Sequence, residues 1–259
     1  MNAVHRLLDP ADGMQVPPGL CALAIMTKAP RPGFVKTRLT PPLTPEESAA
    51  LNVCFLRDTA AAISAAVAEG GSAGVAAYTP VGAEGVWGEI LPGHFTMVAQ
   101  RGEGFGERLT NAVEDLIRIG FASVCLIDSD SPMVPRRIYK RAVELLAAPS
   151  DRVVLGPSDD GGYYLIGLKR LHRRLFQEID WSTERVLTQT RERAAEIRLH
   201  VEELPYSFDV DDGAGLRRLC EEVLIKAPHA ANHPAPQTHA FLSNLIASEG
   251  RDRIWPNET

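Results

Sequence analysis

The fold of this chain is decided by the stretch Leu20-Cys-Ala-Leu-Ala-Ile-Met-Thr-Lys-Ala-Pro-Arg-Pro-Gly-Phe-Val-Lys-Thr-Arg-Leu39. Its first seven residues, Leu20 to Met26, are apolar and are typical of a buried strand. The loop that follows carries four cations within eleven residues, namely Lys28, Arg31, Lys36 and Arg38. Ligands of open α/β sheets collect outside the carboxyl ends of strands, so the stretch predicts an anion site at the end of the first strand.

Outward from this stretch, short apolar runs alternate with longer amphipathic segments. This alternation predicts an α/β fold in which helices connect the strands of a mainly parallel central sheet. The predicted strands are 20–26, 73–78, 95–99, 122–127, 152–156, 162–168 and 197–202. The predicted helices are 45–68, 106–119, 135–147, 183–195 and 213–225, with a further short amphipathic helix after the Pro- and His-containing linker that begins at 226.

The helix at 45–68 has the clearest start signal. Thr44 can cap it, Pro45 suits its first position, and Glu47 stands three residues after the cap as in a capping box. Gly70 and Gly71 should end it. We expect residues 1–18 to be a flexible tail, 19–225 to be one α/β domain, and 226–259 to pack on it as a linker and short helix.

Composition excludes several classes of protein. With 45% hydrophobic and 23% charged residues, the chain is neither disordered nor fibrous. A net charge of −6 argues against a nucleic-acid or anionic-membrane surface. The four cysteines form no C-x-x-C pair, so no zinc or redox site is indicated, and the run at 20–26 is too short for a membrane span. We expect a reduced, cytoplasmic protein.

The basic loop suits a polyphosphate. Gly33 lets the backbone approach a ligand, and the cations can neutralise phosphate oxygens. A solvated basic loop would have the same composition. The loop is not a P-loop, because Val35 stands where that motif needs a glycine before the lysine.

Three acidic segments could face this loop. The strand at 122–127 runs into Asp128 and Asp130, which suit Mg²⁺ or Mn²⁺ shared with a nucleotide but also suit an Asx turn or a helix cap. The Asp-Asp-Gly-Gly sequence that contains Asp160 is a plain hairpin signal unless other site residues surround it. The acidic group at 209–212 either caps the next helix or adds a metal ligand.

Other segments are less specific. The sequence 100–109 has glycines at the wrong spacing for a dinucleotide fingerprint, so we expect a loop at the pocket's border with Gln100 or Arg108 touching the ligand. The histidines of the C-terminal segment are ordinary polar residues in this interpretation: His229, His233 and His239. Three aromatic residues could stack on a sugar or base but more commonly belong to a core: Trp87, Tyr163 and Trp181.

The ordered set of motifs resembles a known family. The chain is similar to the bacterial glycosyltransferase-like proteins called selenodomain-associated transferase 1, of the nucleotide-diphosphosugar transferase superfamily, from about residue 20 to 245. The motifs are Lys28-Ala-Pro-Arg-Pro-Gly33, Lys36-Thr-Arg-Leu39, Asp128-Ser-Asp-Ser-Pro132, Gly156-Pro-Ser-Asp-Asp-Gly-Gly-Tyr-Tyr-Leu165, Trp181-Ser-Thr183 and Asp209-Val-Asp211. The chain departs from the family at Asp128, where many members have glycine. More distantly, it is similar to small nucleotidylyltransferases with a basic loop after the first strand.

The resemblance implies the GT-A fold, a Rossmann-like α/β/α sandwich with a mainly parallel central sheet, together with a divalent metal and an activated nucleotide. It implies nucleotide contacts from the basic loop, including Thr37, with Lys36 also taking part in catalysis. It further implies metal ligation by Asp130, with Asp128 and Asp211 as further candidates, and a reaction centre at Asp160.

Three functions follow from these observations. The first is glycosyl transfer from an NDP-sugar to a small acceptor, with Asp160 as general base. The second is nucleotidyl transfer, in which a phosphorylated or carboxylated substrate attacks an NTP; four cations in one loop suit a triphosphate. The third is a nucleotide-binding protein without catalysis.

Overall fold

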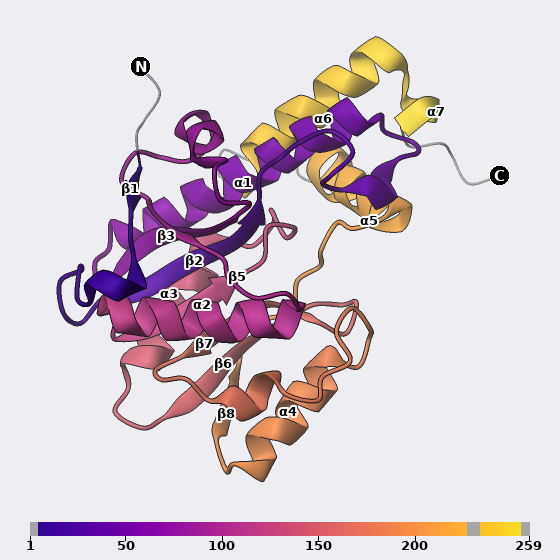
Figure 1. Cartoon of the computed structure of the whole chain (residues 1–259). Coiled ribbons are helices and arrows are strands. Elements are labelled where there is room, and N and C mark those ends of the chain that lie inside the picture. Colours follow the sequence, from indigo (N-terminus) through magenta and orange to yellow (C-terminus); the bar gives the residue numbers. More distant parts are fainter. Residues whose placement is uncertain (1–4, 227–233, 255–259) are drawn as a thin grey trace.

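The computed structural model describes residues 5–226 and 234–254. Its strands form one eight-stranded sheet in the order β1-β4-β3-β2-β5-β7-β6-β8 (Figure 1). The strands are β1 (Arg6–Leu7), β2 (Cys21–Lys28), β3 (Ser72–Thr79), β4 (Thr96–Ala99), β5 (Ser123–Ile127), β6 (Arg152–Pro157), β7 (Tyr163–Leu168) and β8 (His200–Glu203). The helices are α1 (Pro45–Val67), α2 (Phe105–Ile119), α3 (Arg136–Ala147), α4 (Val186–Glu196), α5 (Gly213–Cys220), α6 (Pro236–Glu249) and α7 (Arg251–Ile254), with 3₁₀ segments η1 (Pro10–Asp12), η2 (Thr37–Leu39), η3 (Glu84–Glu89) and η4 (Arg173–Phe176) and a π-helical segment η5 (Glu221–Lys226).

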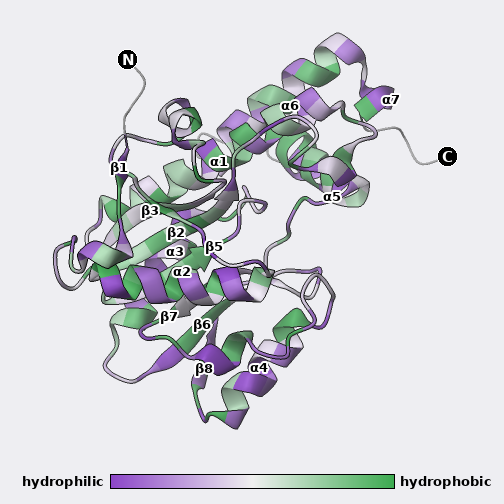
Figure 2. Cartoon of the chain, in the orientation of Figure 1, coloured by the Kyte–Doolittle hydropathy of each residue, from purple (hydrophilic) through white to green (hydrophobic). Residues whose placement is uncertain are grey.

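Helices cover both faces of the sheet, because successive side chains of a strand point to opposite faces. On β2, Leu23 and Ile25 join a core with α1 and α3, whereas Ala22 and Ala24 join a second core with α2 and α4. Figure 2 shows apolar residues along the central strands and both apolar and polar residues along α2. The predicted α/β/α sandwich is therefore confirmed.

One strand in the middle of the sheet runs against its neighbours. β7 pairs antiparallel with β5 and with β6, while the other pairings are parallel. The β6–β7 turn at 158–162 therefore lies at the sheet edge where β2 and β5 end. This topology brings the Asp-Asp-Gly-Gly sequence to the same edge as the basic loop.

Local signals account for the start and end of the long helices. The Thr44 hydroxyl accepts from the Glu47 amide at 3.1 Å, and the Glu47 carboxylate accepts from the Thr44 amide at 2.8 Å. This is the predicted capping box. Gly120 ends α2 with a φ of +113°, in the left-handed region that favours glycine.

The N-terminal segment differs from the expected tail. Arg6–Leu7 forms the edge strand β1 against β4, and Leu8 is buried. The His5 ring nitrogens lie 3.1 Å from the Phe95 carbonyl oxygen and 3.2 Å from that of Trp87. A two-residue strand has no periodicity of its own, so the pattern of the sequence could not reveal it.

The C-terminal helix α6 packs on α1. The N-terminus of α6 has no cap from its own segment; instead, the buried Asp58 of α1 accepts from the backbone amides of Gln237 and Thr238, each at 2.9 Å, and from the Thr238 hydroxyl at 2.7 Å. A third core of α1, α5, α6 and α7 residues lies here. The linker predicted from 226 falls mostly outside the described residues.

Helix α1 is long and apolar enough to cross a membrane by length and composition alone. In its most apolar 18-residue window, however, 56% is buried inside the protein. Because its apolar residues pack against the sheet, α3 and α6, α1 is the core helix of this fold.

Candidate active site

Two neighbouring hollows lie at the carboxyl ends of β2 and β5. The first, which we call the basic cleft, is lined by Met26, Thr27, Lys28, Phe34, Val35, Lys36, Thr37, Arg38, Asn52, Thr79, Gln100, Gly102, Phe105, Arg108, Ser129, Asp130 and Asp211. The second, which we call the apolar pocket, is lined by Met26, Phe105, Leu109, Leu126, Ile127, Asp128, Asp130, Ser158, Asp160, Gly162, Tyr163, Tyr164, Ile166, Trp181, Ser182, Thr183, Val186, Asp209 and Asp211. Asp130 and Asp211 line both, so two carboxylates stand at the boundary between the hollows.

The basic cleft contains most of the predicted nucleotide-binding residues. It is lined by Lys28, Lys36, Thr37, Arg38, Gln100 and Arg108. Arg31 and Gly33 do not line it; both are exposed farther out on the loop, where Gly33 supplies a turn with a φ of +77°. The sequence marked the loop correctly but could not tell which of its cations turn inward.

Two of the lining side chains also hold the cleft together. The Gln100 amide nitrogen donates to the carbonyl oxygens of Thr27, at 3.1 Å, and Ala77, at 2.6 Å. These bonds tie the ends of β2 and β3 beneath the cleft. Arg108 donates to the Glu103 carbonyl at 2.8 Å, which steadies the loop before α2.

Lys36 lies at the centre of the site with only 4% of its side chain exposed. Its Nζ is 2.6 Å from Asp130 Oδ1 and 2.9 Å from Asp211 Oδ1, and it donates to the Val210 carbonyl at 2.8 Å. The Lys36 backbone is left-handed, with a φ of +49°, an uncommon conformation for a residue with a side chain. Burial opposes its charge, yet the two carboxylates raise the pKa of Lys36, so it stays an ammonium.

Asp211 is paired with two cations of the basic loop, Lys36 and Arg38. Arg38 lies 2.6 Å from its second oxygen. Burial alone would raise the pKa of Asp211, but the charges of Lys36 and Arg38 lower it. This boundary carboxylate is therefore ionised.

Deeper carboxylates lack such compensation. Burial and the charge of Asp130 raise the pKa of Asp128 well above its usual range, although the Ser131 hydroxyl donates to it at 2.7 Å. Burial and Asp160 likewise raise the pKa of Asp209, which accepts from Ser158 at 3.1 Å. The cluster therefore has more acidic groups than its two cations compensate, and an added cation would lower its energy.

The donor set fits a divalent cation that also binds phosphate. Within 5–226 and 234–254, no three His, Cys, Asp or Glu side chains are gathered closely enough to hold a metal ion by themselves. Magnesium commonly takes one or two carboxylates and completes its shell with substrate phosphates and water. Asp130 and Asp211, placed where the basic cleft meets the acidic cluster, match that pattern, with Asp128 behind them.

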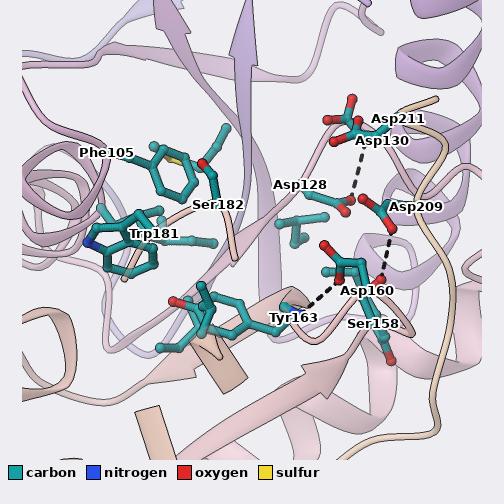
Figure 3. A pocket seen from close by; sticks show the side chains of 18 of the residues that line it. Phe105, Asp128, Asp130, Ser158, Asp160, Tyr163, Trp181, Ser182, Asp209 and Asp211 are labelled. Atoms are coloured by element: carbon teal, nitrogen blue, oxygen red, sulfur yellow. Dashed lines mark hydrogen bonds between the residues drawn. The ribbon is translucent and has the colours of Figure 1, made fainter. Parts of the chain in front are cut away.

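The Asp-Asp-Gly-Gly sequence is both a hairpin turn and part of the site. The Gly162 amide donates to Asp160 at 2.8 Å, which fixes the Asp160 carboxylate toward Asp209 (Figure 3). Gly161 has a φ of +87°, and a Cβ there would lie 2.2 Å from the Glu184 carbonyl oxygen. Asp159 turns away and pairs with Arg218 at 2.6 Å.

The acidic group at 209–212 divides its roles. Asp212 caps α5 by accepting from the Gly215 amide at 2.9 Å, whereas Asp209 and Asp211 face the site. Asp128 and Asp130 do not cap a helix, because α3 begins after Pro135. The sequence left both a helix cap and a metal ligand open for this group; Asp212 is the cap, and Asp209 and Asp211 remain candidates for the ligand role.

The aromatic residues also separate. Trp87 is fully buried in the core. Trp181 and Tyr163 line the apolar pocket together with Phe105, on the side opposite the carboxylates (Figure 3). Of the histidines, His229 and His233 lie outside the described residues, and His239 lies on α6, away from both hollows.

Asn52 is a site residue that sequence analysis missed. It lies in α1 with 3% exposure and lines the basic cleft, and its side-chain oxygen has no hydrogen-bond donor in the described part of the chain. The available signal was a single polar side chain in the run Ala49-Ala-Leu-Asn-Val-Cys-Phe-Leu56. A buried polar group without a partner is costly, so a ligand is the natural partner for this one.

Comparison with known proteins agrees with this fold. Residues 62–183 match a family described as "Uncharacterized protein conserved in bacteria (DUF2064)". A solved structure from Desulfovibrio desulfuricans G20, provisionally described as a nucleotide-diphospho-sugar transferase, is 28% identical with a TM-score of 0.77, over 89% of this chain and 96% of that one. The structure of CMP:2-keto-3-deoxy-manno-octonic acid synthetase complexed with CTP is 12% identical with a TM-score of 0.50, over 79% of this chain and 100% of that one. No curated protein matches the chain.

The resemblance to the nucleotide-diphosphosugar transferase superfamily is thus confirmed. The chain has the fold of transferases that use nucleotides.

Proposed function

We propose that this protein transfers a glycosyl group from an NDP-sugar to a small acceptor. One observation carries the proposal: the basic cleft and the apolar pocket meet at Asp130 and Asp211. A donor with its diphosphate in the basic cleft would place its sugar at this boundary, beside the acceptor.

The cations of the cleft would stabilise the departing diphosphate. Lys28 and Arg38 are exposed and can move to phosphate oxygens, while Lys36 is held at the boundary. Negative charge grows on the diphosphate as the glycosidic bond breaks, so fixed cations stabilise the transition state more than the ground state. Thr37, Gln100, Arg108 and Asn52 would complete the nucleotide contacts.

Asp130, Asp128 and Asp211 would hold Mg²⁺ or Mn²⁺. When bound, the cation would add positive charge beside the diphosphate. Asp160 is the proposed general base for the acceptor, because the Gly162 amide fixes its orientation and it lines the pocket where the acceptor would lie.

Nucleotidyl transfer is the second candidate. Four cations line the basic cleft, Lys28, Lys36, Arg38 and Arg108, and this number suits a triphosphate as well as a diphosphate. In that reaction the second substrate would attack the α-phosphorus and pyrophosphate would leave.

For either reaction we propose small-molecule partners, with no nucleic acid and no membrane, in the cytoplasm. The four cysteines are free and buried. Such thiols are ordinary in a reducing compartment.

Thermal unfolding tests the proposal without an acceptor. The protein is heated with Mg²⁺ or Mn²⁺ and a panel of NTPs, NDPs and NDP-sugars. A ligand at a concentration of about 100 times its Kd raises the free energy of unfolding by about 2.7 kcal/mol. We expect one NDP-sugar and its NDP to stabilise the wild type in a metal-dependent way and to lose this effect in Asp130→Asn, whereas Asp159→Asn keeps it.

The other outcomes point elsewhere. Stabilisation by a single NTP alone would favour nucleotidyl transfer. If Asp130→Asn and Asp160→Asn fold and keep every ligand response and turnover, the protein is a binding protein without catalysis.

A further inference from the structure

We infer that the second substrate is a small molecule with an apolar body of about one ring and a hydroxyl, thiol or amine as its reacting group, and that it carries no phosphate or carboxylate. The inference rests on the proposed function and assigns the apolar pocket to the acceptor. It follows from the shape, the charge and the construction of that pocket.

The size of the pocket suits one ring. Its volume is about 200 Å³. An engineered protein cavity of about 150 Å³ with an apolar lining binds benzene. Most side chains that line the pocket away from the carboxylates are aliphatic or aromatic, namely Met26, Phe105, Leu109, Leu126, Tyr163, Ile166, Trp181 and Val186.

The charge of the pocket excludes an anion. No lysine, arginine or histidine of the described chain lines it, whereas five aspartates do. Three of them, Asp128, Asp130 and Asp211, are the proposed metal ligands, and Asp160 and Asp209 face the acceptor without a cation among the lining residues. The nearest cations, Lys36 and Arg38, are already paired with Asp130 and Asp211. Like charges about 4 Å apart repel by about 4 kcal/mol at an effective dielectric constant of 20, so a carboxylate or phosphate here would meet a large penalty.

The aromatic wall is built rather than incidental. Phe105 and Trp181 meet edge to face with ring centroids 5.3 Å apart. A Cβ on Gly106 would lie 2.4 Å from the Trp181 indole nitrogen, so the indole occupies space that only glycine leaves free. Ser182, next to Trp181, has a φ of +65°, a conformation that turns the chain sharply at the wall. A wall held in this way can bind a ring with little loss of conformational entropy.

The polar end of the pocket supplies the chemistry. The acceptor's oxygen, nitrogen or sulfur would lie near Asp160 and attack the anomeric carbon of the donor. A bond forms between that atom and the anomeric carbon, the bond from the anomeric carbon to the diphosphate oxygen breaks, and the NDP leaves with the electron pair. The acceptor's proton passes to Asp160.

This inference separates the two candidate reactions. A phosphorylated or carboxylated second substrate, as nucleotidyl transfer was expected to use, needs cations around it. The side chains that line the pocket offer none, and the proposed cation at Asp130 and Asp211 would be shared with the diphosphate of the donor. The apolar pocket therefore favours transfer to a neutral or cationic acceptor.

Ligand-observed NMR with three matched probes tests the charge rule on the full chain. Benzyl alcohol, benzylamine and benzoate share a ring and differ in charge. They are titrated without metal and again with Mg²⁺ and the stabilising nucleotide. We expect benzyl alcohol and benzylamine to bind at least tenfold more tightly than benzoate in both conditions.

Two variants locate the probes. Phe105→Ala, at a ring that is 47% exposed, should weaken the binding of benzyl alcohol at least fivefold. Tyr206→Ala, at a ring that is 59% exposed and lines neither hollow, should leave that binding unchanged. Trp181→Leu serves as the second wall variant should Phe105→Ala misfold.

The outcomes are distinct from those of the nucleotide panel. Benzoate binding as tightly as benzyl alcohol would overturn the charge rule, and no binding of any probe would overturn the assignment of the pocket to a ring. Either result leaves stabilisation by an NDP-sugar intact, whereas failure of the nucleotide panel with normal probe binding would overturn the proposed function alone.

Discussion

Replacing Asn52 by leucine should stabilise the free protein and weaken nucleotide binding at the same time. Asn52 is 3% exposed, its side-chain oxygen has no hydrogen-bond donor among the described residues, and the neighbouring Leu51 and Phe55 are fully buried. An unsatisfied buried polar group costs about 1–3 kcal/mol, and leucine also has the higher helix propensity. We therefore expect the free energy of unfolding to rise by about 1–2 kcal/mol, or Tm by about 2–8 °C.

The same change would remove the proposed hydrogen bond between Asn52 and the nucleotide. A hydrogen bond to a charged group such as a phosphate contributes about 1.5–3 kcal/mol, so the Kd of the stabilising nucleotide should rise by at least about tenfold. Thermal unfolding without ligand measures the first effect, and isothermal titration calorimetry measures the second.

Thr59→Val is the matched control. Thr59 lies in the same helix, is 2% exposed and has a hydroxyl without a partner, but it lines neither hollow. We expect a similar rise in Tm with an unchanged Kd. An Asn52→Leu protein that binds nucleotide like the wild type would refute the assignment of Asn52 to the ligand, and a lower Tm would show that the amide has a structural role.

Three further changes probe the site and its support. Lys36→Met should lower the free energy of unfolding at pH 7 by about 1–3 kcal/mol, which is less than the loss for a fully buried ion pair because Asp211 is 35% exposed. Since the folded-state pKa of Asp211 is lowered, we expect this loss, measured by urea titration, to shrink as the pH falls below about 4. An equal loss at pH 7 and pH 3 would contradict the ion pair between Lys36 and Asp211. Asp58→Ala leaves three donors at the start of α6 without their acceptor, so we expect the free energy of unfolding to fall by about 2–3 kcal/mol and amide hydrogen exchange to become faster in α6 alone. Asp58→Asn should have a smaller effect on both. Faster exchange throughout the protein would argue against the cap. Gly161→Ala should lower the free energy of unfolding, measured by chemical denaturation, by at least about 2 kcal/mol, because the new Cβ would lie 2.2 Å from the Glu184 carbonyl oxygen at a left-handed φ. A variant as stable as the wild type would show that the turn is not constrained.

Local patterns in the sequence determined the architecture. Alternating apolar runs and amphipathic segments predicted seven of the eight strands and the order of the main helices, because burial periodicity and capping are read within a few residues. The edge strand Arg6–Leu7 was not predicted, because it is short and its partner, β4, lies about 90 residues later in the chain. The antiparallel direction of β7 follows from the short Asp-Asp-Gly-Gly turn, which cannot make a parallel crossover.

The segments that form the site could also largely be predicted from the sequence. The basic loop and the acidic turns follow strands, and the carboxyl ends of strands form one edge of a sheet, so their convergence could be expected. Carboxylates at the end of a buried strand are costly unless a cation compensates them, so these residues predict a bound cation, and the basic loop predicts a phosphate.

Only the tertiary structure decided the role of each side chain. Asp211 faces Lys36 while its neighbour Asp212 caps a helix, and Asp160 faces the cluster while Asp159 pairs with Arg218. Neighbouring residues of one type have the same local signal, and the partners of Asp211, Asp209 and Asp159 lie 175, 51 and 59 positions away in the chain. The position of Asn52 in the basic cleft and the lack of cations among the described residues that line the apolar pocket are likewise properties of packing between distant segments, which no local pattern encodes.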